Sequence, residues 1–114
     1  MSDFNNIEIN EESLFAMQDL LQDQFPPTIE FCMSEFDRLA NALHEDLEKD
    51  ITDATRHAHS LKSNAAQFGA VSLANLAKQI EHLLSVGDKA AAEPLIAQLD
   101  THIIATKAAL NDKI

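Results

Sequence analysis

The chain of 114 residues has the length of one ordinary domain. Two glycines and three prolines leave too few turn residues for a β-sandwich, a barrel or a glycine-rich phosphate loop. Ala, Leu and Gln are abundant, Tyr and Trp are absent and 46% of the residues are hydrophobic, which together indicate an all-helical fold. The net charge of −11 disfavours nucleic acid and anionic membranes as partners, because binding to either depends on neutralising phosphates.

The N-terminal part predicts two helices separated by a proline pair. Residues 1–9 are polar and expected to be loose, and Asn10 is suited to cap a helix with an acidic first turn. Pro26 and Pro27 interrupt that helix and suit the first turn of the next one, predicted over residues 27–48. The apolar stripe of the first helix is Leu14, Met17, Leu20, Leu21 and Phe25.

Capping residues and glycines mark two further helices. Asp50 or Thr52 is predicted to cap a third helix that ends before Gly69, a C-terminal capping glycine. Ser72 is predicted to cap a fourth helix that ends near Gly87.

The last segment opens at Asp88 and contains Pro94, which implies either a kink or a helix that starts there. Its apolar stripe is Leu95, Leu99, Ile103, Thr106 and Leu110. Short connections between helices favour antiparallel neighbours. The expected fold is therefore an all-α, up-and-down antiparallel four-helix bundle with an additional N-terminal helix, forming one domain over residues 1–114.

Five histidines are the first candidates for chemistry. None follows an acid by three residues, as a di-iron bundle would require. His57 and His59 cannot act as a metal pair, because helical residues two apart point to different sides. A metal-binding bundle is therefore only a third alternative, and no metal ligand is expected.

The third helix places its two histidines differently. Its core stripe contains Leu61, and at about 100° per residue His57 lies about 40° from that residue, on the flank, while His59 lies about 160° away, on the solvent side. The neighbours of His59 on this exposed face are two cations and unusually small residues, namely Arg56, Lys62, Ser63 and Ala66. From spacing alone, His59 could equally be an ordinary surface histidine.

A motif decides between these interpretations. Residues 57–70 read HAHSLKSNAAQFGA, which resembles the signature of the histidine phosphotransfer (HPt) domain, roughly H-x-L-K-G-x-A-x-x-x-G-A. The motif segment covers residues 51–87, and Ser63 departs from it where many HPt domains have glycine. The variant is most similar to small stand-alone bacterial HPt proteins of quorum-sensing phosphorelays. The matching positions are His59, Leu61, Lys62, Ala65, Gly69, Ala70, Leu73 and Glu81.

The resemblance implies a function and a site. His59 would take a phosphoryl group on Nε2 and relay it between receiver-domain aspartates. Lys62 would offset the charge of the phosphoryl oxygens, and the residue matching Glu81 can hold Nδ1–H of the imidazole, although Glu81 could also be an ordinary surface acid. Arg56, Ser63 and Ala66 are expected to dock the partner, although Arg56 could instead pair with Asp53.

The resemblance also implies the partners. They are receiver domains of a hybrid sensor kinase and of a response regulator, and the receiver would supply Mg²⁺, so no cofactor is expected in this chain. The protein is predicted to be a monomeric phosphorelay intermediate rather than an enzyme. The single Cys32 and the absence of a recognisable signal or membrane segment predict a cytoplasmic location. The competing interpretation is a helical adaptor or inhibitor that binds a receiver or kinase without being phosphorylated.

Overall fold

The computed structural model describes residues 7–114, and all regular structure in this range is helical apart from one isolated bridge. The elements in chain order are α1 (Glu11–Leu21), the 3₁₀ turn η2 (Gln22–Gln24), α2 (Phe25–Asp46), α3 (Ile51–Gln67), α4 (Val71–Ser85), α5 (Lys89–Ala97) and α6 (Leu99–Lys113).

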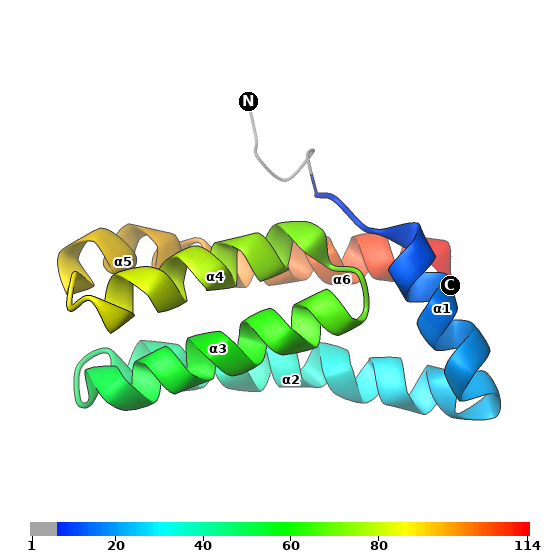
Figure 1. Cartoon of the computed structure of the whole chain (residues 1–114), viewed down its shortest axis with the longest axis horizontal. Coiled ribbons are helices and arrows are strands. Elements are labelled where there is room, and N and C mark those ends of the chain that lie inside the picture. Colours follow the sequence, from blue (N-terminus) through cyan, green and yellow to red (C-terminus); the bar gives the residue numbers. More distant parts are fainter. Residues whose placement is uncertain (1–6) are drawn as a thin grey trace.

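The helices form an elongated up-and-down bundle (Figure 1). Helix α3 packs most extensively against α4 and then against α2, while α5 and α6 together complete the fourth side. Helix α1 lies across one end of the bundle. The predicted antiparallel four-helix bundle with an additional N-terminal helix is therefore confirmed.

The core lies on the axis of the bundle, where every helix contributes apolar side chains. Phe36 and Leu43 of α2, Leu61 of α3 and Leu73 and Ile80 of α4 are fully buried. Each buried side chain of this size stabilises the fold by about 1.5–3 kcal/mol relative to an exposed one. Because this core fixes one face of α3, the opposite face must point to solvent.

The start of the chain differs from the prediction in two respects. Asn10 caps α1 as expected, its side chain accepting a hydrogen bond from the Ser13 amide at 3.1 Å. The prediction that Leu20 belongs to the apolar stripe was wrong, because α1 crosses the end of the bundle and leaves Leu20 74% exposed. Helix α2 starts at Phe25 and ends at Asp46, two residues earlier at each end than predicted, with both prolines in its first turn.

Residues 7–9 are not loose, contrary to the prediction, and residues 1–6 lie outside the described part. Ile9 pairs with Ala70 in an antiparallel bridge, and the Asn10 amide donates to the Gly69 carbonyl at 2.7 Å. The predicted Ser72 cap was also wrong. Helix α4 begins at Val71, and the Ser72 hydroxyl instead accepts a hydrogen bond from the Glu8 amide at 2.7 Å. The N-terminal segment therefore uses the side chain that was expected to cap α4.

The final segment is two helices. The segment opens at Asp88 as predicted, and the Asp88 side chain caps α5 by accepting a hydrogen bond from the Ala91 amide at 3.1 Å. Pro94 is accommodated inside α5, and the helical path breaks at Gln98, one turn later. Ile96, which the predicted stripe omitted, is fully buried, and the predicted Leu95 is partly buried and packs against the core. The alternative in which a helix starts at Pro94 is wrong, because α5 begins at Lys89.

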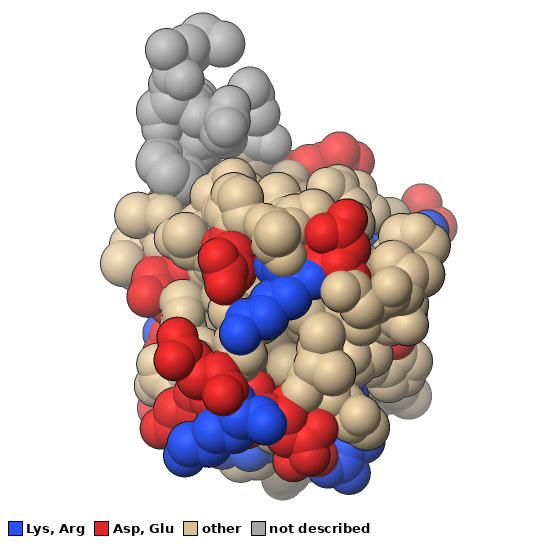
Figure 2. Space-filling model, turned by 90° about the vertical axis from the view of Figure 1, so that its left-hand side faces the viewer, with Lys and Arg blue, Asp and Glu red and all other residues tan. Residues whose placement is uncertain are grey.

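Charges of both signs interleave on the end of the bundle where the α2–α3 and α4–α5 connections lie (Figure 2). No helix within residues 7–114 has the length and apolarity needed to span a membrane.

The Cys32 thiol is buried and points to the Asn64 carbonyl at 3.6 Å, and burial raises its pKa to about 12. This thiol therefore stays protonated near neutral pH.

Candidate functional site

Helix α3 presents His59 to solvent. The helix begins where the Asp50 carboxylate accepts hydrogen bonds from the Thr52 and Asp53 amides at 2.9 and 3.4 Å, so of the two predicted caps Asp50 is the one used. Its buried face consists of Ala54, Ala58, Leu61 and Ala65. On the opposite face the His59 side chain is 58% exposed, as the helical spacing predicted.

A carboxylate from the next helix holds the His59 ring. Oε2 of Glu81 lies 2.8 Å from Nδ1 of His59, and Oε1 of the same carboxylate lies 2.8 Å from Nζ of Lys62. Glu81 therefore bridges the imidazole and the ammonium, with its own side chain only 23% exposed. Glu81 is therefore not the ordinary surface acid that the sequence also allowed.

These contacts keep Glu81 ionised. The hydrogen bond from Lys62 is the largest cause that lowers the pKa of the Glu81 carboxyl below its ordinary value of 4.5, and the His59 contact adds to it, while partial desolvation acts in the opposite direction. Since the folded-state pKa is lowered, the stabilisation is present above pH 4.5 and is lost as the pH falls through the lowered pKa.

The charge of Glu81 also fixes the tautomer of the ring. An ionised carboxylate can only accept hydrogen bonds, so Nδ1 of a neutral His59 must be the nitrogen that carries the proton. The lone pair of the ring then lies on Nε2, the nitrogen that does not face Glu81. The arrangement therefore presents a nucleophilic nitrogen to the exposed side of α3.

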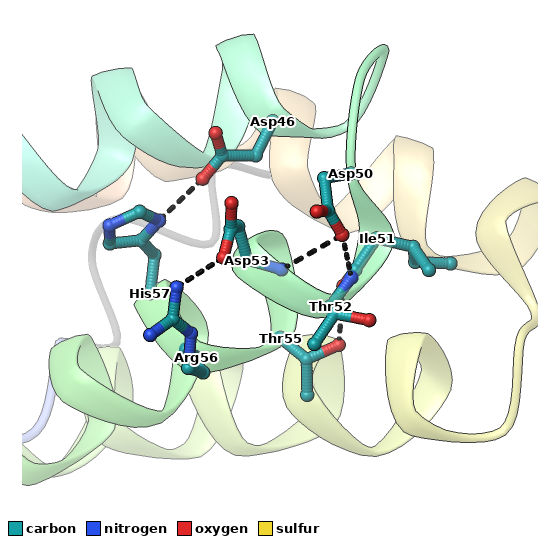
Figure 3. A network of polar contacts seen from close by, with 8 residues as sticks. All are labelled: Asp46, Asp50, Ile51, Thr52, Asp53, Thr55, Arg56 and His57. Carbon is teal, nitrogen blue, oxygen red and sulfur yellow. Dashed lines mark hydrogen bonds and ion pairs between the residues drawn. The ribbon is translucent and has the colours of Figure 1, made fainter.

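His57 and Arg56 have partners of their own (Figure 3). Nδ1 of His57 lies 2.5 Å from Oδ2 of Asp46 at the end of α2, and the ring is 29% exposed, which confirms its predicted position on the flank. The Arg56 guanidinium pairs with the Asp53 carboxylate one turn before it. Of the two roles left open for Arg56, the pair with Asp53 is therefore present.

The surface around His59 is partly flat and partly hollowed. Ser63 and Ala66 are exposed on the same face of α3, as predicted. In the other direction along the helix lies a hollow of about 340 Å³. Its lining residues are Thr55, Arg56, His59, Ser60 and Glu81.

Within residues 7–114, no three His, Cys, Asp or Glu side chains come together in a way that could hold a metal ion.

Sequence reasoning missed the Lys62–Glu81 contact and the hollow. Both depend on the register between α3 and α4, which is set by packing across the turn at Gly69 rather than by periodicity within either helix. The resemblance already pointed to Glu81 beside His59. A second signal was the spacing of 22 residues between the two, which antiparallel helices joined by a short turn bring side by side.

Comparisons with known proteins identify the family and the fold of the chain. The family model described as the Hpt domain matches residues 28–109. A similar solved structure is that of histidine-containing phosphotransfer protein B from Pseudomonas aeruginosa PAO1. It has 23% sequence identity and a TM-score of 0.86, and the match covers 92% of each chain, which shows a shared fold. A search of curated proteins found no match. Because the family model spans most of the chain, the protein belongs to the Hpt domain family and is a histidine phosphotransfer protein of a phosphorelay, a class of intermediates that interact with receiver domains.

Proposed function

We propose that His59 is the residue that accepts and passes on the phosphoryl group, between the receiver domain of a hybrid sensor kinase and that of a response regulator. The observation that carries the proposal is the contact between Nδ1 of His59 and the Glu81 carboxylate at 2.8 Å, made while the ring stays 58% exposed. This contact leaves Nε2 as the free nucleophile on a surface that a partner can reach.

The transfer step follows from this tautomer. The Nε2 lone pair attacks the phosphorus of an aspartyl phosphate, and the bond from phosphorus to the carboxylate oxygen breaks with its electron pair leaving on the aspartate. The ring, which already carries a proton on Nδ1, becomes cationic, and Glu81 lies next to that developing charge. The reverse sequence hands the phosphoryl group to a second aspartate. Mg²⁺ belongs to the receiver in this scheme, and this chain needs no cofactor of its own.

Lys62 supports the site through Glu81. Its ammonium lies 2.8 Å from Oε1 of the carboxylate, so it holds the charge and the orientation of the group that in turn orients His59. To offset the charge of the phosphoryl oxygens, as expected from the sequence, the Lys62 ammonium would have to leave Glu81 or contact both groups.

Replacing Glu81 by alanine is expected to slow transfer by roughly tenfold, by analogy with outer partners of other functional histidines. Loss of the acceptor removes the preference for the proton on Nδ1, so the ¹⁵N chemical shifts of the ring should move toward a mixture of tautomers. The two readouts are the transfer rate and the ¹⁵N spectrum of His59. An unchanged ¹⁵N spectrum would show that the carboxylate does not set the tautomer.

The docking surface is proposed to include Arg56, Ser63 and Ala66. Small exposed side chains on the same face as His59 allow the active-site loops of a receiver to approach the ring closely. A transient contact of this kind buries less than about 1,200 Å² in total.

A bulky residue on this face tests the docking surface. Ala66→Trp is expected to block transfer from a phosphorylated receiver and to leave the melting temperature and the reaction with a small phosphodonor nearly unchanged. Ala108→Trp, at an exposed position on α6, is the matched control and should transfer normally. Transfer by the Ala66 variant at the wild-type rate would place docking elsewhere.

The function itself is tested by mixing the protein with a receiver domain that carries a labelled aspartyl phosphate. Label is expected to appear on this chain and then on a second receiver. A complex that forms without any movement of label would favour the adaptor interpretation. The monomeric state and the cytoplasmic location stay predictions.

A further inference from the structure

Part of the lining of the hollow beside His59 consists of side chains that are suited to bind a phosphoryl group. Its volume is about 340 Å³, and its lining includes the His59 ring, the Arg56 guanidinium and the Ser60 hydroxyl. These are groups that bind phosphoryl oxygens. Glu81 also lines the hollow, but both of its oxygens are engaged, by His59 and by Lys62.

The two cations near His59 differ in how firmly they are held. Lys62 is 31% exposed and lies 2.8 Å from a carboxylate that is itself mostly covered. Arg56 is 73% exposed and is paired, through Nη2, with an Asp53 side chain that is 40% exposed. Arg56 can therefore turn toward a new anion at lower cost than Lys62, because its present pair is the more strongly solvated one.

From this difference we infer that a phosphoryl group on Nε2 of His59 occupies the hollow and that Arg56, rather than Lys62, is its main counter-charge. The inference rests on the proposed role of His59. It assigns Arg56 to the phosphorylated state of this protein itself, beyond any contact with a receiver, while Lys62 stays with Glu81. Asp53, released from Arg56, would return to solvent on the exposed side of α3.

This assignment has a direct electrostatic consequence. A cation close to the phosphoryl group favours its dianion over its monoanion and so lowers the pKa of its second ionisation. A unit charge at contact distance changes a neighbouring pKa by roughly half a unit even in a water-like environment. The phosphoryl group thus reports which cation lies beside it.

The test uses the full-length protein and phosphoramidate, a small donor from which ammonia leaves as the bond between Nε2 and phosphorus forms. No receiver is present, so docking cannot contribute to the result. The ³¹P chemical shift of the phosphohistidine is titrated against pH in the wild type and in the variants Arg56→Ala, Arg56→Lys and Lys62→Ala. Arg38→Ala is the matched control, because Arg38 also pairs with an acid three residues before it and lies on α2, outside the hollow.

Arg56→Ala is expected to raise the second pKa of the phosphoryl group by about half a unit. Arg56→Lys should restore most of the difference, and Lys62→Ala and Arg38→Ala should change it much less. A larger rise in Lys62→Ala than in Arg56→Ala would overturn the inference, as would equal values in Arg56→Ala and the wild type. If the wild type gives no phosphohistidine signal, or His59→Gln gives the same signal, the proposed function fails instead.

Discussion

Replacing His59 by glutamine is expected to abolish phosphorylation of this protein completely, whether the donor is a phosphorylated receiver or a small molecule. Glutamine keeps a polar side chain on the exposed face of α3 but has no lone pair that can displace a carboxylate from phosphorus. The wild-type modification should be labile in acid and stable in alkali, as expected for a phosphoryl group on nitrogen. The measurement is the incorporation of labelled phosphate, followed by treatment at both extremes of pH.

His57→Gln provides the matched control, because it changes a histidine two residues away on the same helix. The variant should accept phosphate normally, since the His57 ring of the wild type contacts Asp46 on the flank of α3 and does not lie on the exposed face that carries His59. Its expected effect is a loss of about 1 kcal/mol in the free energy of unfolding, from the broken side-chain contact. Label retained by the His59 variant, or lost from the His57 variant, would show that the exposed face has been misidentified.

Gly69→Ala is expected to cause the largest loss of stability of any substitution considered for this protein. Gly69 has φ of +79°, and a Cβ atom there would clash with the Asn10 carbonyl oxygen. The left-handed backbone alone costs about 1–2 kcal/mol for alanine, and displacement of the N-terminal segment adds to it. A total of about 3 kcal/mol would lower the melting temperature by roughly 10 °C in a domain of this size.

Gly87→Ala separates the two contributions. Gly87 has a similar φ of +81°, but a Cβ atom there would meet nothing within 4 Å. Only the backbone cost of about 1–2 kcal/mol is expected at this position. Thermal unfolding of both variants by circular dichroism makes the comparison, and equal losses would mean that the approach of Asn10 to Gly69 contributes nothing.

Much of the fold could be predicted because the relevant interactions are local. Asn10 and Asp50 cap the helices they were expected to cap, since a capping side chain reaches only the next two or three amides. The exposed position of His59 followed from helical periodicity alone, because the buried stripe of α3 is narrow and unambiguous. The bundle itself followed from short connections between long helices.

The errors lie where one element meets another. Ser72 has the sequence context of a cap, but the Glu8 amide, 64 residues away, uses its hydroxyl. Leu20 fits the apolar stripe of α1, but only packing decides how much of a helix lying across the end of a bundle is covered. The resemblance pointed to the His59–Glu81 contact, but the Lys62–Glu81 contact needs the register of α3 against α4, which no pattern within a single helix contains.

The pairing of the N-terminal segment with the turn between α3 and α4 has a consequence for where this domain begins. The family model starts at residue 28, yet the Asn10 amide donates to the Gly69 carbonyl at 2.7 Å and the Val71 amide donates to the Glu8 carbonyl at 3.1 Å. Leu14 of α1 is fully buried. The contacts that complete this fold therefore extend about twenty residues upstream of the first residue that the family model matches. The helices that carry His59 and Glu81 are joined at a turn whose backbone hydrogen bonds are completed by residues that lie before the family-model match.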